Sequence, residues 1–279
     1  MSIETRHDAQ DPPAALDPFR IGYRYVPAVG PDGHERPVMV PLTEEDFLHP
    51  QEEDRQMLTD LHTETVNYLR DAIRIANDGR AGFRVFSDHR IDWQVPGVLP
   101  HGPDVVAFEN FFADWDPLRG TLPVRDLGLE VLVVIEVTSE ATRATDFEPK
   151  FLEFFDAGIP YYVILDAAGP EGYEKVLGYG RGDDGFEPLP RDDRLGVLVP
   201  DVNIWLRWAG DRFVAATEAG AYIPTNLELA RDAERERQRA DVETLRAAAE
   251  KLRADEATQR LEDLQRELAA LKARRNGSH

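Results

Sequence analysis

The sequence predicts an α/β fold organised around a strand–helix–strand unit. Residues 131–135 form an uninterrupted apolar run rich in β-branched side chains, which is typical of a strand buried on both faces of a sheet. The pattern then becomes helical, and Gly158 follows the last helical residue, where a glycine commonly ends a helix. A second apolar strand ends at Asp166. In open α/β sheets, the point where a strand gives way to a helix is a common place for chemistry.

Composition excludes several classes of protein. The 279 residues suffice for one sizeable core, and the absence of cysteine excludes disulfides and thiolate metal sites. The first residues are too polar for a signal peptide and no apolar run has the length of a membrane span, so we expect a cytoplasmic protein without a membrane partner. The formal net charge of −21 argues mildly against tight binding of nucleic acid, because acidic surfaces repel phosphates unless basic residues or metal ions gather on one face.

Short strands and one helix are expected ahead of the central unit. Residues 1–18 lack periodicity and are predicted to be a disordered tail. The expected elements after the tail are strands at 19–26 and 36–40, a helix over about 52–77, and strands at 83–87 and 90–95 joined by a turn.

The remainder of the chain has two regions of different character. A β-rich flank of short strands is expected at residues 173–180, 186–189, 195–208 and 211–216. From 226 to 275 the sequence has neither Gly nor Pro, which predicts a helix roughly 75 Å long. Its heptads slip in register between Leu252 and Leu261, so it is either a coiled coil that joins copies into a homo-oligomer or a solvated helix. The domain prediction is a tail over 1–18, a folded domain over 19–220 and a charged helix over 226–275.

Two carboxylates stand at the ends of expected strands. Pro103-Asp104 leads directly into the apolar run 105–108, and Glu136 ends the central strand. Each has a purely structural interpretation as well. Asp104 can cap a turn, and Glu136 can form an ion pair with Lys150, since an unpaired buried charge is costly. Asp146 can likewise cap the helix.

Several of these residues, in this order and spacing, resemble a known family. The segments that carry the resemblance are Pro103-Asp104, Glu136-Val-Thr-Ser139, Asp146, Lys150 and Gly158-Ile-Pro-Tyr-Tyr-Val-Ile-Leu-Asp166. They are similar to the Uma-type restriction endonucleases, a family of the PD-(D/E)XK nuclease superfamily, and the resemblance covers about residues 19–216. It implies a restriction-endonuclease-like mixed β-sheet core flanked by helices, with a β-rich flank and a long C-terminal helix. It also implies an endonuclease that hydrolyses phosphodiester bonds in DNA.

The resemblance further implies which residues hold a metal. Asp104 and Glu136 would bind Mg²⁺ or Mn²⁺, with the backbone carbonyl of Val137 as a third ligand, because Mg²⁺ is held by one or two carboxylates plus waters and substrate phosphate. The metal would activate water and neutralise charge in the transition state.

The resemblance places the lysine differently from the superfamily signature. That signature has it two residues after the glutamate, where this chain has Thr138. In the resembled family the lysine has moved to the following helix, and Lys150 holds the matching position, where it would orient water or stabilise the transition state. Asp146 lies four residues earlier, so both side chains are expected on one face of a single helix. The residues with implied accessory roles are His62, Glu64, Thr138 and Asp146.

Two other functions stay open at the level of sequence. A catalytically silent nuclease-fold scaffold, acting in protein–protein assembly through the C-terminal helix, is favoured by the acidic charge and by Thr138. An enzyme acting on another phosphate ester would use the same residues. A nuclease requires basic residues to gather around Asp104 and Glu136. The candidates for this are Arg84, Arg90, Arg143 and Lys150.

Overall fold

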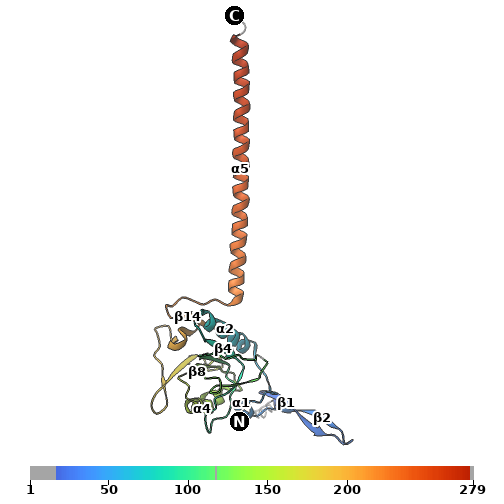
Figure 1. Ribbon diagram of the computed structural model, residues 1–279, viewed down its shortest axis with the longest axis vertical. Coiled ribbons are helices and arrows are strands. Elements are labelled where there is room, and N and C mark those ends of the chain that lie inside the picture. The colour runs from blue at the N-terminus through green and yellow to red at the C-terminus, as the bar shows by residue number, and fades with distance from the viewer. Residues whose placement is uncertain (1–16, 117, 277–279) are drawn as a thin grey trace, which may run out of the picture. The chain divides into compact units, whose positions relative to one another are not determined.

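The computed structural model describes residues 17–116 and 118–276 (Figure 1). The predicted tail over residues 1–18 lies outside the described residues except for its last two. Contacts within the chain divide it into two compact units, Met1–Ile223 and Pro224–His279.

A six-stranded mixed sheet forms the centre of the first unit. Its strand order is β11-β10-β9-β8-β6-β4. The strands are β4 (Arg84–Ser87), β6 (Val105–Glu109), β8 (Glu130–Val137), β9 (Tyr161–Leu165), β10 (Val176–Arg181) and β11 (Phe186–Pro188). β8 and β9 pair parallel, and the other neighbours in this sheet pair antiparallel. The predicted strand–helix–strand unit is therefore the parallel pair β8–β9 with its crossover connection.

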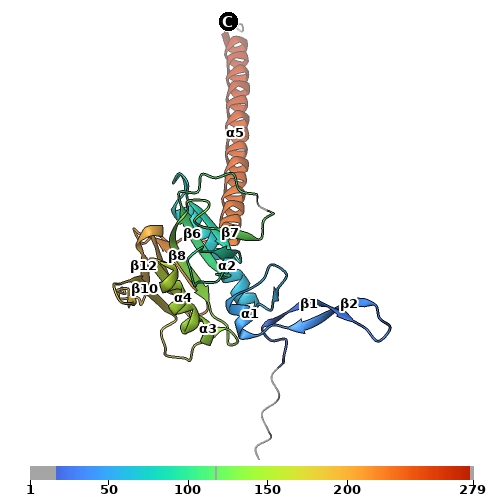
Figure 2. The same ribbon diagram turned by 60° about the horizontal axis from the view of Figure 1, so that its bottom comes forward.

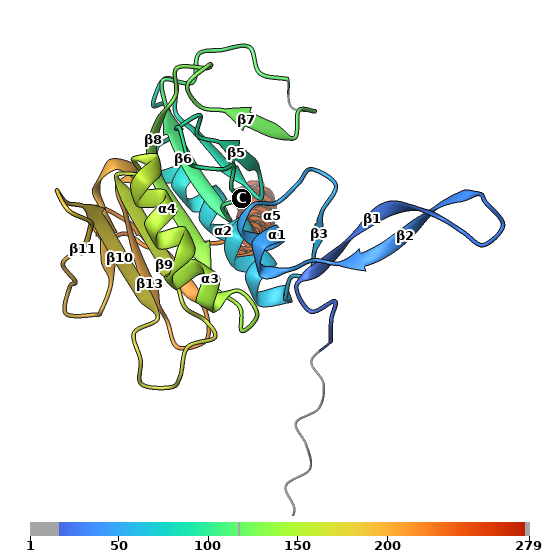
Figure 3. The same ribbon diagram turned by 90° about the horizontal axis from the view of Figure 1, so that it is seen from below.

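Helices cover both faces of this sheet, as its buried central strand requires. Val133 and Ile135 of β8 pack with Leu69 of α2 (Asp60–Ala76) on one face. Val134 packs with Phe154 of α4 (Pro149–Ala157) on the other. Figure 3 shows α4 in front of the sheet and α2 behind it. Because side chains alternate along a strand, Glu136 shares the face of Val134, toward α4.

The crossover contains two short helices rather than one. α3 (Arg143–Phe147) ends at Glu148, and α4 begins at Pro149. A proline disfavours helical geometry at the preceding residue and lacks the N–H that would continue the ladder. The expectation of one helix carrying Asp146 and Lys150 was therefore wrong. Gly158 ends α4 in the left-handed conformation, with a φ of 86°.

The N-terminal part of the first unit differs from prediction at one helix boundary. The predicted helix over 52–77 begins only at Asp60, because the side chain of Thr59 accepts the N–H of His62 and caps the helix. The residues before the cap form β3 (Arg55–Gln56), which pairs with β1 (Gly22–Val29). Strand β1 also pairs with β2 (Glu35–Pro41), and this hairpin projects from the rest of the unit (Figure 2). The short helix α1 (Glu44–Leu48) follows and is closed by a capping box.

The two strands predicted around residues 88 and 89 do not form a hairpin. β4 pairs with β6, whereas β5 (Arg90–Asp92) pairs parallel with β7 (Thr121–Pro123) in a separate sheet. Asp88 has a left-handed φ of 50° and donates its N–H to the Asp104 carbonyl at 3.2 Å. This bond extends the β4–β6 ladder by one residue and turns the chain away from β4.

The β-rich flank forms a third sheet, and the second unit is a single helix. The flank comprises β12 (Val197–Val199), β13 (Ile204–Trp208) and β14 (Phe213–Thr217), with the 3-10 turn Pro200–Val202 between the first two. The helix is α5 (Asn226–Asn276). No helix in the described part of the chain combines the length and apolar character that a membrane span needs.

Candidate active site

The sheet register brings two carboxylates together at one end of β8. In the antiparallel β6–β8 ladder Val105 faces Ile135, so the next pair along is Asp104 and Glu136. Alternation places both side chains on the face covered by α4, which carries Lys150. The side chains of Glu136 and Lys150 are fully buried, and Asp104 is only 6 % exposed.

Lys150 is the cation of this buried cluster. Its Nζ lies 3.1 Å from Glu136 Oε2 and 3.0 Å from Asp146 Oδ1. Asp146 and Lys150 are therefore in contact although they lie on two helices, α3 and α4. The ammonium also lies 4.4 Å from the ring centre of Phe47, a residue of α1. The hydroxyl of Tyr162 donates to the backbone carbonyl of Asp146 at 2.8 Å and fixes the end of α3 against the sheet.

Asp104 is held by groups from two other elements. The N–H of Val137 donates to Asp104 Oδ2 at 2.6 Å, and His62 Nε2 lies 3.1 Å from Asp104 Oδ1. His62 occupies the first turn of α2, where the Thr59 cap fixes its backbone. Burial lowers the pKa of His62, which favours the neutral imidazole.

The electrostatics of the cluster show an excess of negative charge. Burial raises the pKa of Asp104 well above its usual range, and the charge of Glu136 adds to the effect. Burial raises the pKa of Glu136 to about 7 despite the opposing charge of Lys150. The pKa of Asp146 is also raised, chiefly by burial. Burial alone would lower the pKa of Lys150, but the three surrounding carboxylates raise it.

The cluster fits a divalent cation by charge and by ligand type. Three buried carboxylates face one ammonium, so two negative charges remain when all are ionised. Glu136 Oε1 is buried without a hydrogen-bond partner in the described residues. Carboxylate oxygens are the ligands that Mg²⁺ and Mn²⁺ prefer, and an ion of charge +2 would balance the excess. Asp104 and Glu136 are therefore suited to hold such an ion.

Other candidate residues lie outside this cluster. Glu64 is exposed on α2. Thr138 donates its hydroxyl to Asp166 Oδ1 at 2.9 Å, and Arg143 Nε donates to Asp166 Oδ2 at 2.9 Å. Thr138 is thus bonded to a side chain that directly follows β9 (Tyr161–Leu165), outside the cluster around Lys150. Arg84 donates to the carbonyl of Phe83, and Arg90 donates to Pro50 and Thr121. Four basic residues were candidates for gathering around Asp104 and Glu136. Of these, Lys150 forms ion pairs within the cluster, whereas Arg84, Arg90 and Arg143 bond to other groups.

The cluster reaches the surface through a small depression. Its lining includes Arg20, Ile21, Met57, Leu58, His62 and Asp104, and it encloses about 10 Å³. That is about the space of one water molecule. The sequence predicts neither the residues that line this depression nor the contact of Phe47 with Lys150. Both depend on packing between segments far apart in the chain.

Comparison with known proteins identifies the class. The fold is a mixed-sheet core flanked by helices, with a β-rich flank and a long C-terminal helix, as predicted. The model of the Uma2 family, described as "Putative restriction endonuclease", matches residues 52–207. The match covers more than half of the chain, which therefore belongs to the Uma2 family. The predicted family is confirmed.

One solved structure among those similar to the chain is described as a putative nuclease belonging to DUF820 from Anabaena variabilis ATCC 29413. It is 16 % identical in sequence, with a TM-score of 0.42, and the similarity covers 58 % of this chain and 86 % of that one. Among curated proteins, none matches the sequence.

Proposed function

We propose that the chain is a metal-dependent endonuclease that hydrolyses phosphodiester bonds in DNA. The observation that carries the proposal is the β6–β8 register, which places Asp104 beside Glu136 on the face occupied by Lys150. Membership of the family supports the same reaction class. Asp104 and Glu136, with the carbonyl of Val137, would hold Mg²⁺ or Mn²⁺, which when bound supplies charge neutralisation and an activated water.

Lys150 acts as a hydrogen-bond donor and not as a general base. Its raised pKa keeps the side chain protonated at neutral pH, and an ammonium has no lone pair to accept a proton. It would orient the attacking water or stabilise the negative charge that develops on the phosphate oxygens. His62 holds Asp104 in place, and Asp146 holds Lys150, so both are positioning residues.

Metal binding is tested by titrating Mn²⁺ into the full chain by calorimetry. Wild type should bind one Mn²⁺ ion more than the Asp104→Ala/Glu136→Ala double variant. Glu130→Ala is the matched control, since Glu130 lies at the exposed start of the same strand and should leave binding unchanged. Equal binding by wild type and the double variant would contradict the assignment of these ligands.

Cleavage is tested with supercoiled, linear and single-stranded DNA in Mg²⁺ and in Mn²⁺. Wild type and Glu130→Ala should cut, whereas the double variant and Lys150→Met should lose activity. If a protein that binds Mn²⁺ at Asp104 and Glu136 cuts no form of DNA with either metal, the nuclease proposal fails.

The alternative is a catalytically silent scaffold that assembles through α5. It is favoured by the ion pair of Lys150 with Glu136 and by two exposed apolar stripes on α5. The stripes are Val242, Leu245 and Leu252, then Leu261, Leu264 and Leu268. Leu252 and Leu261 are nine residues apart, or about two and a half turns, so the two stripes do not form one continuous seam.

Sedimentation of the full chain tests assembly through these stripes. Wild type should be a homo-oligomer, and Leu245→Lys/Leu252→Lys or Leu264→Lys/Leu268→Lys should dissociate it. Loss of assembly with unchanged DNA cleavage would separate the role of α5 from the nuclease reaction. A wild type that sediments as a monomer at micromolar concentration would rule out assembly through α5.

A further inference from the structure

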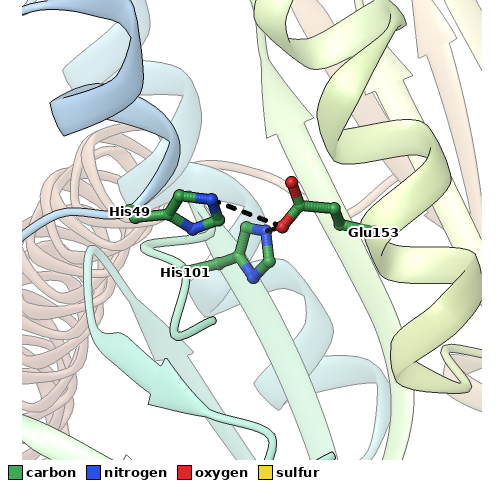
Figure 4. A group of neighbouring side chains, drawn as sticks. All are labelled: His49, His101 and Glu153. Atoms are coloured by element: carbon green, nitrogen blue, oxygen red, sulfur yellow. Dashed lines mark ion pairs between the residues drawn. The ribbon is translucent and has the colours of Figure 1, made fainter. Parts of the chain in front are cut away.

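A second polar cluster lies beside the first and is not used by the proposed nuclease reaction. His49 follows α1, His101 precedes β6, and Glu153 lies on α4 one turn after Lys150 (Figure 4). Ligand-type atoms of the three side chains all lie within 4.8 Å of one another. Glu153 Oε2 lies 3.0 Å from His101 Nε2 and 3.5 Å from His49 Nε2.

The contacts of His101 fix the position of its proton. The indole N–H of Trp93 donates to His101 Nδ1 at 2.8 Å, and an indole nitrogen is a donor only. Because Nδ1 accepts this bond, the proton of the imidazole lies on Nε2, which faces Glu153 Oε2 at 3.0 Å. Neither ring nitrogen of His101 then offers a lone pair to an ion, and its part is to orient the carboxylate of Glu153.

His49 has the opposite arrangement. Its Nδ1 lies 3.4 Å from the carbonyl oxygen of Pro100, which can only accept, so this contact favours a proton on Nδ1 and a lone pair on Nε2. That lone pair faces two carboxylates, with Glu153 Oε2 at 3.5 Å and Glu45 Oε1 at 3.7 Å.

These separations suit a bridging ion better than direct hydrogen bonds. Hydrogen bonds between nitrogen and oxygen are ordinarily 2.7–3.2 Å long. In a tetrahedral zinc site with bonds of about 2.1 Å, neighbouring ligand atoms lie about 3.4 Å apart. Imidazole and carboxylate together are ligands that zinc-type ions accept, and a ligating histidine commonly donates its other N–H to a carbonyl or carboxylate.

We propose that His49 Nε2 and Glu153 bind a divalent transition-metal ion of the zinc type, with His101 as the donor that orients Glu153 and with the exposed side chain of Glu45, now 3.7 Å from His49 Nε2, closing on the ion as a third ligand. Glu45 is exposed, so the ion would enter from the surface. The site would tie α1 to α4. Since α1 carries Phe47 and α4 carries Lys150, the ion would hold the aromatic cover of the first cluster in place. This proposal is independent of the nuclease reaction.

The test is a titration of chelator-treated full-length protein with Co²⁺ and with Zn²⁺. Calorimetry measures the binding of both ions, and the visible absorption of tetrahedral Co²⁺ reports the geometry of the site. The parent is the Asp104→Ala/Glu136→Ala variant, in which the first cluster cannot contribute ligands. It should bind one ion, His49→Ala should abolish binding, and Glu45→Gln should weaken it. Glu45 is exposed, so its variant tests the site without disturbing the core. His34→Ala, an exposed histidine on the β1–β2 hairpin, is the control and should bind like the parent.

The role of His101 is tested separately. His101→Phe should weaken binding by about 10–100-fold, as loss of a hydrogen-bond partner of a metal ligand does. In the parent, X-ray absorption should show a single imidazole ligand on the bound ion. Failure of the parent to bind either ion, or undiminished binding by both His49→Ala and Glu45→Gln, would overturn the proposal. Two imidazole ligands in the parent would overturn the assignment of His101.

Discussion

Ion pairs occur both in the first buried cluster and on α5, and the two sets differ in what they contribute. Lys150 is enclosed with three carboxylates and has no access to solvent. On α5, pairs such as Arg246–Glu250 and Arg235–Asp232 are largely exposed. Water screens the exposed pairs, so each is worth little, whereas a buried charge depends wholly on its partners. Removing one partner should therefore destabilise the fold strongly in the buried cluster and hardly at all on α5.

The largest expected effect comes from removing the buried cation. Lys150→Met leaves the carboxylates of Glu136 and Asp146 buried without their partner, and this should lower the free energy of unfolding by about 3–5 kcal/mol. Urea denaturation of the full chain measures it. Lys251→Met, at an exposed position on α5, is the matched control and should change stability by less than about 0.5 kcal/mol. Equal stability of the two variants would show that Lys150 is not the dominant partner.

A pH titration sharpens the contrast. The pKa of Glu136 is raised from its ordinary value of 4.5 to about 7, so the folded state binds this proton more tightly than the unfolded state. Stability of the metal-free chain should therefore fall as pH rises from 4.5 to 7, by on the order of 3 kcal/mol. Glu136→Gln should flatten the curve in this window, and saturating Mn²⁺ should do the same in wild type. A wild-type curve that rises across this window would mean that the cluster carries no excess negative charge.

A smaller effect is expected at the edge of the cluster. His62→Phe removes the contact with Asp104 Oδ1 and should cost about 1–3 kcal/mol, because one oxygen of a buried carboxylate loses its partner. Glu64→Ala, two residues along on the exposed side of α2, should stay within about 0.5 kcal/mol of wild type. Thermal unfolding of both variants provides the measurement. A larger loss for the Glu64 variant would restore that residue as a candidate for the site.

The smallest effect is expected on α5. Arg246→Ala removes an exposed pair with Glu250 and should change the helix content and its unfolding midpoint barely beyond error. Circular dichroism at low and high salt checks this. A marked, salt-dependent loss would indicate that the pair is buried in an assembly of the chain.

Local patterns in the sequence predicted the central fold well. The apolar run of β8, the glycine after α4 and the second strand required only neighbouring residues, and the family was recognisable from the same segments. The strands on either side of Asp88 are present as predicted, but local alternation does not indicate that β4 and β5 pair in different sheets, because strand partners are decided by the whole sheet. The helix predicted over 52–77 is shorter in the structure, because Thr59 caps it and periodicity alone does not mark the cap.

The sequence indicates several residues of the buried cluster, but not the contacts between them. Asp104 and Glu136 stand out as carboxylates beside apolar strands, but their proximity follows from the β6–β8 register, which no local pattern fixes. Phe47 contacts Lys150 through its ring, and Trp93 donates a hydrogen bond to His101; both contacts join separate segments of the chain. The cluster of His49, His101 and Glu153 was not predicted for the same reason.

The small depression beside Asp104 also bears on the rate of the proposed reaction. A depression of about 10 Å³ does not admit a nucleotide, and part of its rim is the short ladder between β1 and β3. That ladder pairs only Gly22 with Gln56 and Tyr23 with Arg55, with one further bond from Met57 N–H to the Ile21 carbonyl. So short a ladder can open locally at far lower cost than the central sheet. For the proposed cleavage of DNA, we therefore expect turnover to be limited by how often this ladder separates. The amides of the ladder should exchange hydrogen with solvent long before those of β8.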